Sequence, residues 1–214
     1  MLIASSPLLI LIFLTSSCLV TGQGRKPGSC RTDIQYLQSV GRAAFEGIWF
    51  MQRGRALNEE RAFRCGRMDY EYLYTKPEEI GYRARNFKIS TVDRTSIANI
   101  GSLKFPSRWE GQFRIKYWPT ANPGAEAIDW ENLRYKVLTL DCDTLIIYAC
   151  QNFEEESEHA ELVWVYTRQP HPLDTIENAY TAALTAKGID VGKLYKIRHT
   201  FCRNYGIPQA AAPQ

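Results

Sequence analysis

The chain has 214 residues, a size that fits one domain with a single core. Apolar residues make up 45% of it and charged residues 23%, which argues against an intrinsically disordered chain. The net charge is +3, from 26 basic and 23 acidic residues, and the basic residues are scattered along the sequence. Because nucleic-acid binding needs a concentrated basic face, a nucleic-acid partner is not expected.

The N-terminus has the pattern of a processing segment. An apolar run from Leu8 to Leu14 precedes polar residues and then Val-Thr-Gly at 20–22. This pattern suits signal peptidase, so residues 1–22 are predicted to be a signal peptide and Gln23 the first mature residue. The alternatives are a membrane anchor, for which the run is far shorter than the roughly 20 residues required, and a lipoprotein anchor at Cys18. We expect a secreted, extracellular protein with no integral membrane segment in the mature chain.

Export makes the cysteine count informative. An odd number of cysteines remains after removal of Cys18, namely Cys30, Cys65, Cys142, Cys150 and Cys202. Two disulfides and one free thiol are therefore expected in an oxidising compartment, although spacing leaves the pairing open. No CxxC or HxxxH spacing occurs and the three histidines stand far apart, so no metal site is predicted.

After a short segment at residues 32–42, strand-like runs alternate with turns. The alternation is clearest where Met68 and Tyr70 lie on one face and Arg67 and Asp69 on the other. The predicted strands are Glu46–Arg53, Phe63–Thr75, Ile80–Val92, Ile97–Phe105, Glu110–Trp118, Leu133–Leu140, Thr144–Gln151 and Glu161–Arg168. The acidic run at 154–158 could bind a cation, but a solvated hairpin tip is the favoured interpretation.

One helix comes after the strands. Asp174 is predicted to cap its N-terminus, with Glu177 completing a capping box and Gly188 ending the helix. A final short strand is expected at 193–200, and residues 206–214 form a Pro/Ala tail predicted to be disordered.

Short half-polar strands and then one helix predict an all-β protein. The expected architecture is an eight-stranded, up-and-down antiparallel barrel with the helix packed outside. The interior of such a barrel is either filled by side chains or just large enough for one small ligand, and the pattern does not decide between these. The residues predicted to face the interior, and to bind a ligand there, are Met68, Tyr70, Tyr72, Phe113, Ile115, Tyr117, Leu162, Trp164 and Tyr166.

Two short motifs resemble those of the lipocalin family. Gly47-Ile48-Trp49-Phe50 is similar to the G-x-W motif that opens the lipocalin barrel, and the run ending at Arg168 is similar to the last-strand motif. In the family that arginine lies across the tryptophan, a cation–π contact worth about 0.5 to 2 kcal/mol. The resemblance therefore implies structural roles for Gly47, Trp49 and Arg168. It covers most of a single domain at residues 23–205 and is nearest to apolipoprotein D and the insect bilin-binding lipocalins.

The resemblance also implies a disulfide pattern. It maps the family's bridges onto Cys30–Cys150 and Cys65–Cys202, which leaves Cys142 as the free thiol. The middle motif of the family reads T-D-Y, and here Asp141 is kept while Cys142 replaces the tyrosine. In the family this motif often lies at a receptor-facing end of the barrel. Because the tyrosine is replaced by Cys142 here, a receptor partner is not assumed.

A carrier function is implied by the same resemblance. The expected ligand is a small hydrophobic molecule such as a fatty acid, sterol, retinoid or bilin-like pigment, with no other cofactor, and Trp164 is expected to contact it with Tyr70 and Tyr72 as neighbours. One alternative is a lipid isomerase, which needs a cysteine inside the barrel, whereas alternation turns Cys65 outward and Cys142 lies in a loop. The other is a ligand-free interaction protein, such as a homodimer linked through Cys142.

Overall fold

The computed structural model describes most of the chain between residues 25 and 202. The described residues are 25–55, 63–75, 80–92, 94–105, 110–119, 128–129, 133–153 and 157–202. The predicted signal peptide, the predicted tail at 206–214 and most of the acidic run lie outside these ranges. Among the described segments, no helix has the length and apolar character needed to cross a bilayer.

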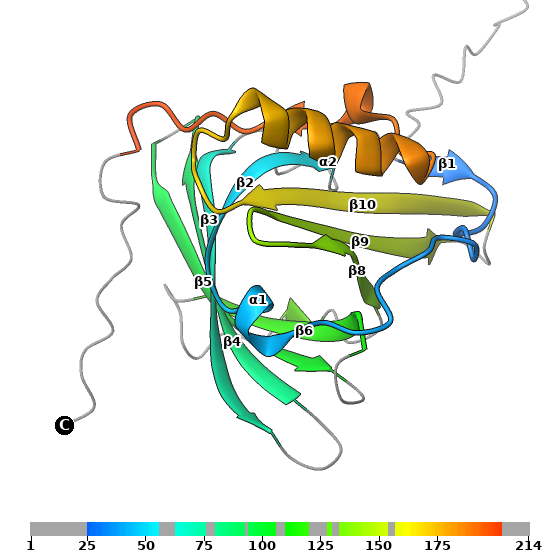
Figure 1. Cartoon of the computed structure of the whole chain (residues 1–214), viewed down its shortest axis with the longest axis horizontal. Coiled ribbons are helices and arrows are strands. Elements are labelled where there is room, and N and C mark those ends of the chain that lie inside the picture. Colours follow the sequence, from blue (N-terminus) through cyan, green and yellow to red (C-terminus); the bar gives the residue numbers. More distant parts are fainter. Residues whose placement is uncertain are drawn as a thin grey trace, which may run out of the picture.

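Eight antiparallel strands form a closed barrel, as predicted. Closure comes from β10, which pairs with β9 on one side and with β2 on the other (Figure 1). The barrel strands are β2 (Gly47–Arg55), β3 (Phe63–Thr75), β4 (Ile80–Ser90), β5 (Ser96–Phe105), β6 (Gln112–Pro119), β8 (Tyr135–Leu140), β9 (Thr144–Phe153) and β10 (Glu158–Thr167). Three short strands, β1 (Arg25–Pro27), β7 (Ile128–Asp129) and β11 (Tyr195–Lys196), pair with β10, β6 and β2.

Charge pairs fix which face of the neighbouring strands β3 and β4 points outward. Arg83 lies 3.2 Å from the Glu71 carboxylate and Arg85 lies 2.7 Å from it. Tyr82 and Ala84, which alternate with these arginines, are buried in the core. The odd-numbered residues of β4 therefore point outward and the even-numbered residues point toward the barrel interior.

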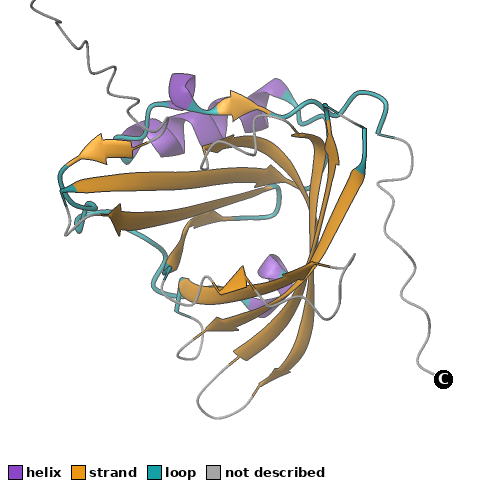
Figure 2. Cartoon of the chain, turned by 180° about the vertical axis from the view of Figure 1, so that it is seen from behind, coloured by secondary structure: helices purple, strands orange, loops and turns teal. Residues whose placement is uncertain are grey.

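Helix α2 (Asp174–Ala186) covers the outer face of the barrel beside β10. Its buried residues Tyr180 and Leu184 form a second core cluster with Val163 and Val165 of β10. Figure 2 shows the helix outside the barrel from the opposite side. The sequence-based position of this helix is therefore confirmed.

The predicted capping box is wrong. Leu173 occupies the N-cap position without a side-chain hydrogen bond, and Asp174 is the first helical residue. Glu177 binds Arg53 of β2 at 2.6 Å instead, and this hydrogen bond holds the pKa of the Glu177 carboxyl below its usual value. Gly188 does take the left-handed conformation expected after a helix, with φ of 70°.

The C-terminal segment fills a gap in the barrel wall. Only Tyr195–Lys196 forms a strand within the predicted range 193–200, and a 3-10 turn at Val191–Lys193 precedes it. Beyond it, the amide of Ile197 donates to Gln52 of β2, and the amide of Cys65 in β3 donates to Arg198, both at 2.9 Å. The segment is needed here because β2 and β3 pair with each other only near the start of β2.

Two disulfides hold the ends of the chain on the barrel. Cys30 is bonded to Cys150 and Cys65 to Cys202, as the resemblance implied. The second bridge spans 137 residues. In loop-entropy terms, a bridge of that span stabilises the fold by about 5 kcal/mol.

The alternation argument for Cys65 does not hold in detail. A bulge between Arg64 and Arg67 interrupts the pairing of β3 with β4, and Cys65 has a φ of 57°. Its side chain is completely buried against the C-terminal segment rather than exposed beside Arg67.

We predict that acid destabilises the protein through His199. Its Nε2 lies 2.7 Å from the Met51 carbonyl, and burial lowers the pKa of its imidazole below the ordinary 6.5. Because the fold favours the neutral ring, the unfolded chain binds more protons, and stability falls as the pH drops below the ordinary pKa. The melting temperature should decrease between about pH 7.5 and about pH 5.5, and less in His199→Gln. The exposed neighbour His171 provides the control. Its repulsion is a smaller cause of the lowered His199 pKa than burial, so His171→Gln should keep most of the wild-type decrease. A decrease in His199→Gln equal to that of the wild type contradicts the assignment.

Candidate functional site

One end of the barrel is closed by the short helix α1 (Arg42–Phe45), which lies inside the ring of strands in Figure 1. The completely buried indole of Trp49 donates its N–H to the Phe45 carbonyl at 3.0 Å. The Arg168 guanidinium lies 3.6 Å from the centroid of the Trp49 ring and donates to the carbonyls of Ala44 and Ile48. We call this the α1 end, and the opposite end, where β3 begins at Phe63, the far end.

Gly47 is required by this closure. Its φ is 99°, and a Cβ atom at this position would lie 3.1 Å from a guanidinium nitrogen of Arg168. A larger residue would strain the backbone and displace the arginine. The G-x-W pattern therefore has a structural cause in this chain.

Asp141 and Cys142 lie in the turn between β8 and β9. The Asp141 carboxylate accepts hydrogen bonds from the backbone amides of Asp143 and Thr144 at 2.8 and 2.7 Å. The Asp143 carbonyl accepts from the Arg168 amide, so this turn belongs to the α1 end. Cys142 is exposed and is the one free cysteine among the described residues.

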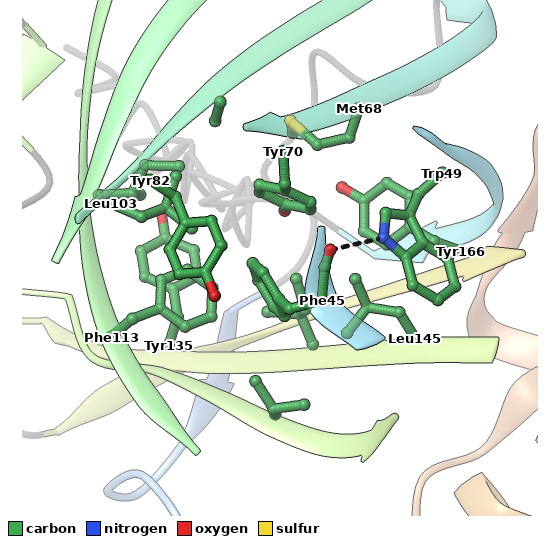
Figure 3. Close-up of a cluster of buried hydrophobic side chains, with 14 of the residues drawn as sticks. Phe45, Trp49, Met68, Tyr70, Tyr82, Leu103, Phe113, Tyr135, Leu145 and Tyr166 are labelled. Atoms are coloured by element: carbon green, nitrogen blue, oxygen red, sulfur yellow. Dashed lines mark hydrogen bonds between the residues drawn. The ribbon is translucent and has the colours of Figure 1, made fainter. Parts of the chain in front are cut away.

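An aromatic cluster fills the barrel interior next to α1. Phe45 points into the barrel and its ring centroid lies 4.5 Å from that of Tyr70, 5.4 Å from Tyr82 and 5.9 Å from Phe113. Figure 3 shows these rings packed together in the interior. All four are at most 2% exposed. The α1 end of the interior is therefore a packed core.

The predicted lining residues face the interior wherever their side chains are described. The buried ones belong to the main core cluster: Met68, Tyr70, Phe113, Ile115, Leu162 and Tyr166. Tyr72 and Trp164 are partly buried and pack against this cluster. The side chain of Tyr117 lies outside the described residues.

The structure separates Tyr72 from Trp164, which were expected to be neighbours. The ring of Tyr72 contacts Tyr82 at 5.7 Å, and its backbone amide donates to Glu46, the residue after α1. Trp164 contacts Tyr135 at 5.7 Å, and Tyr135 is the first residue of β8. Tyr135 also stacks on Phe113 at 5.2 Å, so it lies between the cluster around Phe45 and Trp164.

Sequence reasoning missed two aromatic residues near Trp164. Tyr135 is one of them. The sequence contains a signal for it, because Tyr135 alternates with the buried Val137 along the same strand. Tyr195 is the other. It pairs with Gly54 on one side of β2, and Trp164 pairs with the same glycine on the other side of β2. Tyr195 packs against the main cluster. A Cβ atom on Gly54 would lie 3.0 Å from the Tyr195 hydroxyl, so glycine makes room for this ring.

Tyr70 places a hydroxyl group within the apolar main cluster. Tyr70 is 2% exposed, and burial raises the pKa of its hydroxyl, so it is a neutral donor at physiological pH. No described residue forms a hydrogen bond with this hydroxyl.

Comparison with known proteins identifies the fold. No family model matches the chain, and no curated protein is similar to it in sequence. Among solved structures, insecticyanin from the tobacco hornworm Manduca sexta superposes with a TM-score of 0.69 at 18% identity, over 83% of this chain and 90% of its own. The chain has the lipocalin fold.

Two other solved structures with this lipocalin fold are also similar. The amine-binding protein of Rhodnius prolixus, solved as a tryptamine complex, has a TM-score of 0.59 at 15% identity and covers 78% of this chain and 85% of its own. Lobster apocrustacyanin A1 has a TM-score of 0.53 at 14% identity and covers 74% and 79%. At these identities the similarity concerns the fold and does not identify a ligand.

We predict that Trp49 contributes to stability and not to ligand binding. Truncation of a large buried aromatic residue lowers the free energy of unfolding by about 3 to 5 kcal/mol, and we expect a loss of this size in Trp49→Ala. Denaturant unfolding of the two proteins measures this difference. An unchanged free energy of unfolding, together with lost ligand binding, would show that Trp49 belongs to the binding site.

Proposed function

We propose that the protein is a secreted carrier that binds a small hydrophobic molecule in the far half of the barrel interior. The observation that carries this proposal is Trp164, an interior indole that stays partly exposed where it packs against the buried core. An apolar guest that covers this indole gains about 25 cal/mol for each Å² of apolar surface removed from water.

The residues around Trp164 suit such a guest. Tyr135 and Tyr195 supply flat apolar surface on either side, and the aromatic cluster around Phe45 closes the site below them. Binding by aromatic surface with few polar groups is typical of sites for fatty acids, sterols, retinoids and pigments.

A carrier is favoured over a lipid isomerase. An isomerase of this fold needs a reactive thiol inside the barrel. Four of the described cysteines form disulfides, and the fifth, Cys142, is exposed in the turn at the α1 end. The proposed function therefore involves binding without chemistry.

Two further observations support the proposal. The amine-binding protein of Rhodnius prolixus, which shares the fold, was solved with the small molecule tryptamine. The two disulfides are of the kind that persists in oxidising compartments, which supports secretion and the proposed signal peptide at residues 1–22.

The test is a binding titration. Delipidated protein is titrated with fatty acids, retinol and a tetrapyrrole, and quenching of tryptophan fluorescence is measured. At least one class should give saturable quenching, and calorimetry should show at least tenfold weaker binding to Trp164→Ala, about 1.4 kcal/mol. The matched control is Ile100→Ala, at an exposed position on the outer wall of β5, which should bind like the wild type. Absence of saturable binding across the panel contradicts the carrier function.

A further inference from the structure

A group of polar side chains lies on the interior face of β4 and β5 in the far half of the barrel. Asn86 and Lys88 are even-numbered residues of β4, so they share the inward face of Tyr82 and Ala84. Asn99 of β5 is paired directly with Asn86 and shares the face of the buried Leu103. Side chains paired in this way have Cβ atoms about 5 Å apart, so the two amides are neighbours.

Lys88 is held close to the far end by an aromatic ring. Its ammonium nitrogen lies 3.9 Å from the ring centroid of Phe63, the first residue of β3. None of the described carboxylates forms an ion pair with Lys88, and neither Asn86 nor Asn99 has a side-chain hydrogen bond to a described residue. All three are partly buried. Partly buried polar groups without protein partners are available to a ligand.

The chemistry of this group fits a carboxylate. An ammonium supplies a positive charge with three donors, and each asparagine amide supplies two more donors. A hydrogen bond from an ammonium or amide N–H to an ionised carboxylate is about twice as strong as a hydrogen bond between two neutral groups.

We infer that the ligand is an amphipathic acid whose carboxylate binds Lys88, Asn86 and Asn99. Its apolar body lies across the barrel against Trp164 and Tyr135. This inference rests on the proposed carrier function and narrows it to a ligand class. The preference is opposite to that expected of a protein that binds amines.

The test compares three ligands with the same chain and different head groups. Decanoate, decanol and decylamine are titrated into delipidated full-length protein by isothermal titration calorimetry. Decanoate should bind at least tenfold more tightly than decanol, and decylamine more weakly than both. In Lys88→Met the affinity for decanoate should fall at least tenfold, while the affinity for decanol stays within twofold of the wild type. Lys88→Arg, which keeps the charge, should recover most of the decanoate affinity.

Lys104→Met is the matched control. Lys104 is an exposed lysine on the outer face of β5, and its loss should leave all three affinities unchanged.

Equal decanoate binding by wild type and Lys88→Met, or tighter binding of decylamine than of decanoate by the wild type, overturns the inference. If Lys88→Met does not fold, the wild-type ranking of the three head groups decides alone. If decanol binds and decanoate binds no better, the carrier function stands and the acid preference fails, whereas binding of none of the three contradicts the carrier function for this class of ligand.

Discussion

The contact between the Arg168 guanidinium and the Trp49 indole organises the rest of the structure. Arg168 also donates to the Ala44 and Ile48 carbonyls, and Trp49 donates to the Phe45 carbonyl, so the two residues together hold α1 in the end of the barrel. With α1 held there, Phe45 enters the interior and completes an aromatic core. Burial lowers the pKa of the Arg168 guanidinium, and the backbone carbonyls and the aromatic face around it offset part of this cost.

This closure divides the interior into two halves with different properties. The half next to α1 is packed with aromatic rings that are almost inaccessible to solvent, and it contributes stability. The far half holds the partly exposed Trp164, with Tyr135 and Tyr195 beside it and the polar group around Lys88 on the other wall. A ligand bound in the far half, as proposed, would lie against this packed core, which needs little ordering on binding.

Sequence alone predicted the features that local periodicity and short motifs determine. Alternation located the strands and the inward face of β10, and the motifs at Trp49 and Arg168 indicated the barrel and its closed end. Phe45 was missed because it precedes the first strand and has no periodic partner. The capping box failed because a tertiary partner, Arg53, takes Glu177. The polar group around Lys88 was also missed, since inward alternation was applied only to apolar residues and a lysine is usually interpreted as solvent-exposed.

A crystal structure with ω-bromodecanoate would show directly how a ligand lies in the barrel, because anomalous scattering locates the bromine at the end of the alkyl chain. We expect the bromine beside Trp164 and Tyr135, and the carboxylate within hydrogen-bonding distance of Lys88. The aromatic rings around Phe45 should keep their positions. Bromine bound on the outer surface of the barrel, or placed at Lys88 with the carboxylate beside Trp164, would contradict it.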